Sequence, residues 1–188
     1  MRSFDPRRVG RLECAMWVAY YRRRWWHLLA AAIALVHHAF GLPWPATLRG
    51  AWLLLHANRR WAPPHRDADG ARRAMRRFYA LVAARHGEDF DVQRAAWLDV
   101  EWWRAHREER RDAGGERAIA DALVALYAHV YAVAPGDVRV AAQQRALAMR
   151  HSDRWVAEGC PPHSPRVAAE RAALVRSYAA LLAAVHVV

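Results

Sequence analysis

The stretch FDPRRVGRLECAMWVAY at residues 4–20 decides how this chain is organised, because a related stretch, FDVQRAAWLDVEWWRAH, occurs at residues 90–106. At this offset of 86 residues, Trp17 falls on Trp103 and Glu13 falls on Asp99. A second set of matches lies 100 residues apart: Arg76, Ala80, Leu81, Ala83, Ala84 and His86 reappear as Arg176, Ala180, Leu181, Ala183, Ala184 and His186. The pattern predicts an internal duplication, with repeats at residues 1–88 and 89–188.

Composition favours helices in both repeats. Alanine, leucine and arginine dominate, and the only isoleucines and threonine are Ile33, Ile119 and Thr47. Asp5-Pro6 and Ser164-Pro165 are typical helix starts, because a capping side chain precedes a proline in the first turn. A chain of 188 residues can enclose one sizeable core. The sequence therefore predicts a single all-α, bundle-like domain of seven or eight helices in two pseudo-symmetric sets.

Prolines, glycines and capping residues mark the expected helix boundaries. We expect a long helical segment over residues 6–40 with a kink near residues 24 and 25, followed by a loop-and-helix pattern along the rest of the chain. The further helices are expected at residues 45–60, 69–85, 91–111, 116–133, 137–157 and 165–185, with a loop at 112–115.

The leading helix of each repeat carries the same column of polar and aromatic residues. Glu13, Trp17 and Tyr20 are spaced as i, i+4 and i+7, so they lie on one helix face beside the apolar stripe. Asp99, Trp103 and His106 form the equivalent column in the second repeat. Each leading helix therefore presents a carboxylate, an indole and then a phenol or imidazole along a face that borders the core.

Duplicated halves can pack about a pseudo-twofold axis, as the subunits of symmetric dimers do. Such an axis would place the two leading helices side by side and antiparallel. Glu13 would then face His106, and Tyr20 would face Asp99. Trp17 would lie beside Trp103. We expect this seam between the repeats to hold the functional groups.

Three functions are compatible with that seam and with the rest of the sequence. In the first, the protein binds a small anionic or aromatic ligand, with Trp17 and Trp103 as walls and the polar groups as donors and acceptors. In the second, it is an enzyme with Glu13 and His106 as an acid–base pair assisted by Tyr20 and Asp99. The same residues could instead only satisfy one another and set the helix register.

The third function rests on the distribution of charge. The chain has no lysine, and residues 1–88 contain 16 arginines and five carboxylates, an excess of +11 that equals the net charge of the whole chain. The first repeat could therefore act as a basic adaptor on nucleic acid or on an anionic membrane surface. A hairpin of residues 25–40 and 45–61, with an apolar tip at residues 42–45, would suit the membrane. The candidate phosphate contacts are Arg22, Arg23, Arg24, Arg59, Arg60, Arg72, Arg73, Arg76 and Arg77.

Nothing in the sequence requires a cofactor. Two carboxylates and a histidine at the seam could bind iron, manganese or zinc, but the paired Glu-x-x-His motifs of di-iron bundles are missing. Two cysteines and the absence of a signal-peptide pattern predict a cytoplasmic protein, membrane-peripheral if the adaptor function holds. Apolar helix faces left over from the core would also allow a homodimer.

Overall fold

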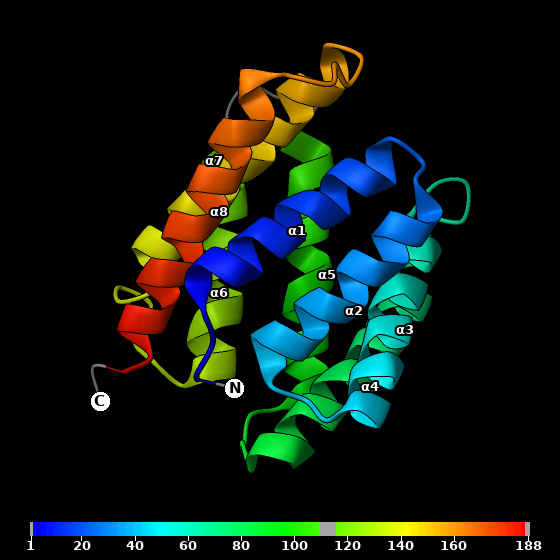
Figure 1. The fold of residues 1–188 in the computed structure, drawn as a ribbon. Coiled ribbons are helices and arrows are strands. Elements are labelled where there is room, and N and C mark those ends of the chain that lie inside the picture. The colour runs from blue at the N-terminus through cyan, green and yellow to red at the C-terminus, as the bar shows by residue number, and fades with distance from the viewer. Residues whose placement is uncertain (1, 110–115, 187–188) are drawn as a thin grey trace.

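The fold consists of α-helices joined by short connections (Figure 1), as seen in a computed structural model that describes residues 2–109 and 116–186. The helices are α1 (Pro6–Tyr21), α2 (Trp25–Phe40), α3 (Trp44–Trp61), α4 (Ala68–His86), α5 (Val92–Glu109), α6 (Glu116–Tyr131), α7 (Arg139–Ala157) and α8 (Pro165–Ala184). The all-α prediction is confirmed, with eight helices and no strand among the described residues. The loop expected at residues 112–115 lies outside them.

Local capping explains where the helices begin. The Asp5 carboxylate accepts hydrogen bonds from the backbone N–H groups of Arg7 and Arg8, at 2.9 and 3.3 Å. Asp91 has the same role at the start of α5, and the Ser164 hydroxyl caps α8. These side chains satisfy backbone donors that have no partner within the first turn.

The long helix expected over residues 6–40 is in fact two helices. Residues 22–24 form a turn between α1 and α2, and Arg23 has a φ of +55°, which a continuous right-handed helix does not allow. The chain therefore reverses here, and α2 packs back against α1.

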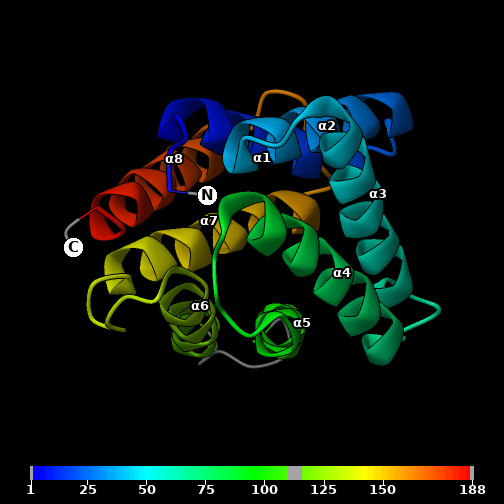
Figure 2. The same cartoon turned by 90° about the horizontal axis from the view of Figure 1, so that it is seen from below.

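The helices close into a ring (Figure 2). Each helix packs mainly against its neighbours in the sequence, and α8 packs against α1. The closing contact is tight at Gly10, where a Cβ atom would lie 2.8 Å from the backbone nitrogen of Val175. Glycine thus permits the approach of α1 to α8 that completes the ring.

The prediction that the two leading helices, α1 and α5, lie side by side and antiparallel is wrong. The main neighbours of α1 are α2 and α8, those of α5 are α4 and α6, and the two helices lie on opposite sides of the ring (Figure 2). Short connections make sequence neighbours pack first, which leaves no place for α1 directly beside α5. Four helices come from each predicted repeat, but the structure does not confirm a pseudo-symmetric relation between them.

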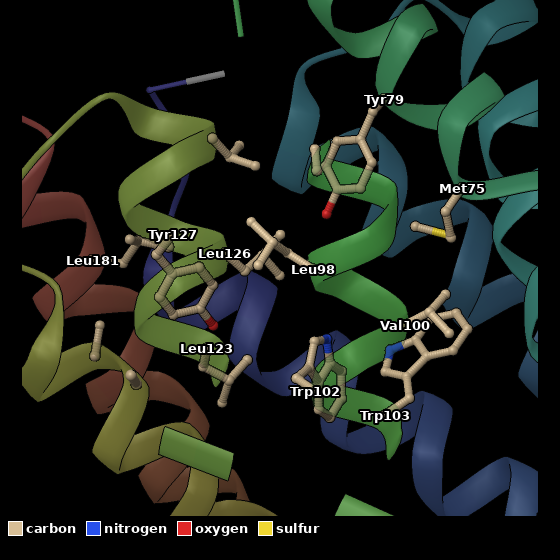
Figure 3. Close-up of a cluster of buried hydrophobic side chains, with 14 of the residues drawn as sticks. Met75, Tyr79, Leu98, Val100, Trp102, Trp103, Leu123, Leu126, Tyr127 and Leu181 are labelled. Carbon is tan, nitrogen blue, oxygen red and sulfur yellow. The ribbon is translucent and has the colours of Figure 1, made fainter. Parts of the chain in front are cut away.

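Apolar side chains from the helices fill most of the ring (Figure 3). Tyr79 of α4, Trp102 and Trp103 of α5, and Leu123 and Tyr127 of α6 all point into the space between the helices. This core surrounds Glu13 and Asp99 and keeps both acids largely out of solvent.

Candidate functional site

A cavity of about 160 Å³ lies in the middle of the ring. Each of the eight helices contributes to its wall, and much of that wall is aromatic. The aromatic side chains include Trp17, Trp102, Trp103, Tyr79 and Tyr127. Two acidic residues, Glu13 and Asp99, reach the same cavity from opposite sides of the ring.

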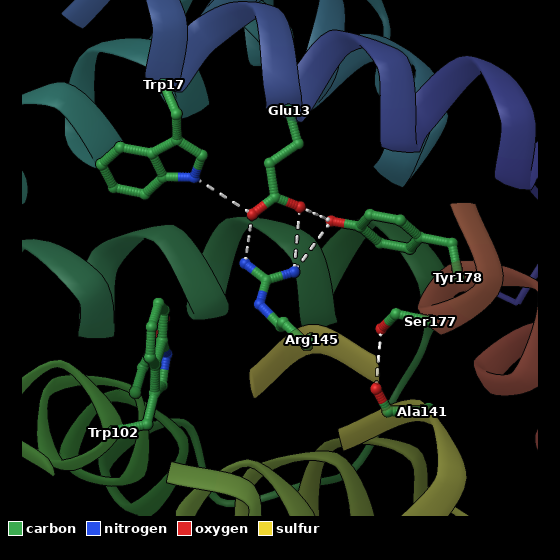
Figure 4. A network of polar contacts seen from close by, with 8 residues as sticks. Glu13, Trp17, Trp102, Ala141, Arg145, Ser177 and Tyr178 are labelled. Carbon is green, nitrogen blue, oxygen red and sulfur yellow. Dashed lines mark hydrogen bonds and ion pairs between the residues drawn. The ribbon is translucent and has the colours of Figure 1, made fainter. Parts of the chain in front are cut away.

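Glu13 forms a buried ion pair with Arg145 of α7 (Figure 4). Arg145 Nη2 donates to Glu13 Oε1 at 2.6 Å, and Nη1 donates to Oε2 at 2.9 Å. The hydroxyl of Tyr178 donates to Oε2 at 2.6 Å, and Trp17 Nε1 donates to Oε1 at 3.3 Å. Both carboxylate oxygens are therefore satisfied by charge-assisted hydrogen bonds.

The ion pair is neutral as a unit. Burial by itself would lower the pKa of Arg145, but the adjacent Glu13 carboxylate, together with Tyr127 and Tyr178, outweighs burial and holds that pKa well above its ordinary value. The guanidinium also lies 5.4 Å from the ring of Trp102, on the cavity wall. Arg145 thus has little charge left to offer an anion in the cavity.

Asp99 has similar neighbours but a different charge environment. Trp102 Nε1 donates to Oδ1 at 2.6 Å, and the Tyr79 hydroxyl donates to Oδ2 at 3.0 Å. Within residues 2–109 and 116–186, no arginine forms an ion pair with Asp99. Burial raises its pKa from 3.8 to about 6, although the hydrogen bonds from Trp102 and Tyr79 lower it. Asp99 is therefore a mostly ionised carboxylate at neutral pH that has no ion-pair partner among the described residues, although the charge of Arg145 also favours its ionised form.

A second cavity, of about 210 Å³, adjoins the first and shares Trp17 and Trp103 with its wall. Tyr20 and His106 line this second cavity, at the end of the ring where α1 and α5 end. His106 Nε2 forms a hydrogen bond with Asp153 Oδ2 of α7 at 2.8 Å. An imidazole held by a carboxylate in this way can accept and release protons.

The three residue pairs expected across the seam are wrong. The partner of Glu13 is Arg145, not His106, and the partner of His106 is Asp153. An acid–base pair of Glu13 and His106 is therefore not formed. Asp99 binds Tyr79 rather than Tyr20.

The aromatic pair also differs from the expectation. The ring of Trp17 contacts Tyr20 and Tyr21, and that of Trp103 contacts Trp61 and Trp102. All six residues of the two predicted columns nevertheless line one or both of the adjoining cavities. Helix periodicity determines which face points inward, but the closure of the ring determines which side chains meet.

Sequence reasoning missed four residues of the site: Arg145, Tyr178, Tyr79 and Tyr127. Tyr79 and Tyr178 lie within the segments that match near the 100-residue spacing, so the duplication contained a signal for them. No comparable signal marks Arg145. Its importance depends on α7 and α1 being brought together through α8.

Among the described residues, partners are found for three of the nine candidate phosphate-binding arginines. Arg22 donates to the Cys160 carbonyl, Arg60 pairs with Asp67, and Arg72 pairs with Asp69 and Glu101. Arg72, Arg73 and Arg76 line a shallow groove between α4 and α5. The exposed arginines of the set are Arg23, Arg24, Arg59, Arg60, Arg73, Arg76 and Arg77.

A third buried acid, Glu170 of α8, lies outside both cavities. Burial, together with the charges of Glu13 and Asp153, raises its pKa from 4.5 to about 8, so it is mostly neutral at pH 7. Among the described residues, no three His, Cys, Asp or Glu side chains come together as a metal site requires. The described residues therefore contain no cluster of ligands for an iron, manganese or zinc ion.

No known protein family, curated protein or solved structure is significantly similar to this chain.

Proposed function

We propose that the protein binds a small aromatic ligand that carries a cationic or hydrogen-bond-donating group, in the central cavity. The observation behind this proposal is that the carboxylate of Asp99, which has no ion-pair partner among the described residues, reaches a cavity whose wall contains many aromatic side chains. Aromatic walls favour a planar apolar ligand, and the carboxylate favours a donor at one end of it. The protein would thus act as a ligand-binding protein.

The size of the cavity limits the ligand to about one ring. An engineered cavity of about 150 Å³ lined by apolar side chains is known to accept benzene. The cavity of about 160 Å³ in this protein can therefore accommodate a single aromatic ring with a short substituent. Trp102 and Trp103 would flank the ring, and Asp99 would accept from the substituent.

Charge distinguishes the two ligand classes suggested by the sequence. An anionic ligand would need Arg145, whose two terminal nitrogens already bind Glu13. It would also be repelled by Asp99. The cationic or neutral aromatic class is therefore the better match, and the anionic class is the weaker one.

Three ligands of similar shape test this proposal: benzylamine, toluene and benzoate, titrated into the full chain at pH 7 and followed by NMR chemical shifts. We expect benzylamine to bind about tenfold more tightly than toluene, because one charge-assisted hydrogen bond contributes about 1.5 kcal/mol or more. We expect benzoate to bind most weakly. The preference for benzylamine should fall as the pH is lowered below about 6, where Asp99 becomes protonated.

Two matched variants locate the effect. Asp99→Asn should remove the preference for benzylamine while toluene still binds, because the cavity walls are unchanged. Glu170→Gln changes another buried acid outside the cavity and should leave all three affinities unchanged. Failure of benzylamine and toluene to bind saturably would refute the proposal, as would an undiminished benzylamine preference in Asp99→Asn.

A further inference from the structure

The outer faces of α2 and α3 expose an unusual amount of large apolar surface. Of the eight large hydrophobic residues that are exposed in the described structure, six lie on these two adjacent helices. Trp26 is 83 % exposed, Trp52 68 % and Trp44 61 %. The six residues, which we call the α2–α3 face, are Trp25, Trp26, Leu29, Trp44, Leu48 and Trp52.

On α3, helix geometry places the exposed residues on a face that turns away from the ring, whereas on α2 they lie in the first two turns of the helix, which are exposed on most sides. On α3, Trp44, Leu48 and Trp52 follow one another at intervals of four residues, so they form one stripe. The opposite side of α3 is buried at Gly50 and Ala57. No other segment of the described chain therefore covers the α2–α3 face.

The stretch of chain between the exposed residues of α2 and those of α3 contains no Asp, Glu, Lys or Arg. α2 contains no Asp, Glu, Lys or Arg, so no charged side chain interrupts its outer face. At the junction, the ring of Trp44 stacks on His37 of α2 with centroids 4.6 Å apart. The apolar hairpin tip expected at residues 42–45 is wrong in one respect, because Leu42 is buried. The available surface is the outer face rather than the tip.

The charge around this face has one sign. Residues 15–66 contain seven arginines and no carboxylate. Exposed arginines stand next to the apolar residues in the sequence, with Arg24 before Trp25 and Arg49 after Leu48. A second copy of this face would bring arginines opposite arginines, which disfavours symmetric self-association. The partner that matches is apolar within and anionic at its surface.

An anionic lipid bilayer has both properties. Tryptophan partitions into the headgroup region of bilayers, and arginine binds lipid phosphates. None of the described helices is long and apolar enough to cross a bilayer alone; α2 and α3 together meet the length and composition of a broken span, but they are bent by 118° at their junction. Their buried residues are packed into the ring, so the exposed residues of the α2–α3 face are the ones free for lipid.

We propose that the α2–α3 face docks the protein onto the surface of an anionic bilayer, where the tryptophans enter the headgroup region and the arginines contact lipid phosphates. This interaction is separate from ligand binding in the cavity, since none of the six residues lines either cavity. Contacts between this face and the lipid would hold the protein at the membrane surface, without a helix crossing the bilayer.

Sedimentation with vesicles tests the proposal, using the full chain. Vesicles of phosphatidylcholine alone are compared with vesicles of phosphatidylcholine and phosphatidylglycerol in equal amounts. We expect binding only to the anionic vesicles, with an affinity that falls steeply as salt is raised. The double variant Trp26→Ser/Trp52→Ser should bind at least about tenfold more weakly, because two interfacial side chains are lost.

Two controls keep the test specific to this face. Trp97→Ser removes an exposed tryptophan on α5 and should bind like the unchanged protein. Arg73→Ser/Arg76→Ser removes two exposed arginines on α4 and should weaken binding less than Arg23→Ser/Arg24→Ser. Full vesicle binding by Trp26→Ser/Trp52→Ser would overturn the proposal. So would binding to duplex DNA or RNA, or concentration-dependent dimerisation through the same tryptophans, without binding to anionic vesicles.

Discussion

Replacing Arg145 with methionine should destabilise the protein severely, because it leaves the Glu13 carboxylate buried without its counter-charge. The ion pair has contacts of 2.6 and 2.9 Å, and the Glu13 side chain is only 2 % exposed. Methionine has a similar length, so the change removes charge and hydrogen bonds more than volume. Breaking one side of a buried ion pair costs about 3–5 kcal/mol.

This cost is a large share of the stability of a single domain, which is about 5–15 kcal/mol. For a chain of this size, the midpoint of thermal unfolding should fall by about 6–20 °C. Urea and thermal unfolding at pH 7, followed by circular dichroism, measure both quantities.

A matched control and a double variant decide whether the ion pair is the cause. Arg139→Met removes an arginine of the same helix from an exposed pair with Asp121, and it should change stability by no more than about 0.5 kcal/mol. Glu13→Leu/Arg145→Met should recover most of the loss, because neither charge of the pair remains. The reasoning is refuted if Arg145→Met costs less than about 1 kcal/mol, or if the double variant is no more stable than Arg145→Met alone.

Three further outcomes follow from buried groups of the ring. The pKa of Asp99 is raised from 3.8 to about 6 in the folded protein, so the folded protein holds this proton more tightly than the unfolded chain does. Asp99 therefore lowers the free energy of unfolding as the pH rises from about 4 to about 6, and it remains unfavourable at higher pH. In urea unfolding, the free energy of unfolding of Asp99→Asn should rise by up to about 3 kcal/mol relative to that of the unchanged protein between about pH 4 and pH 7. Stability curves of the two proteins that stay parallel over this pH range would contradict this. Gly10→Ala should be less stable by about 1–2 kcal/mol, because the cost of overpacking against the backbone of α8 exceeds the gain in helix propensity. Gly136 has open space around it, so Gly136→Ala should leave the stability unchanged in the same assay. Burial raises the pKa of the Cys14 thiol to about 12, so iodoacetamide followed by mass spectrometry should find Cys160 modified in the folded protein and Cys14 only after unfolding; modification of folded Cys14 would show that α1 opens.

Part of the site was readable from the sequence because it depends on local periodicity. The caps at Asp5 and Asp91 mark the starts of two helices, and the spacing of Glu13 and Asp99 along them places both acids beside an apolar stripe. Such features depend on residues within a few turns of one another. They are the same whichever helix packs alongside.

The partners of those acids were decided by the tertiary structure alone. Glu13 meets Arg145 because α8 closes the ring against α1 and packs on α7, and Asp99 meets Tyr79 because α4 packs beside α5. A twofold arrangement of the same helices would have paired the acids differently with an equally reasonable pattern of charge. Sequence alone thus determined the helices and their inward faces, since these are set by contacts along the chain. The tertiary structure decided which acid is neutralised and which remains charged, because that depends on contacts between residues as far apart as Glu13 and Arg145.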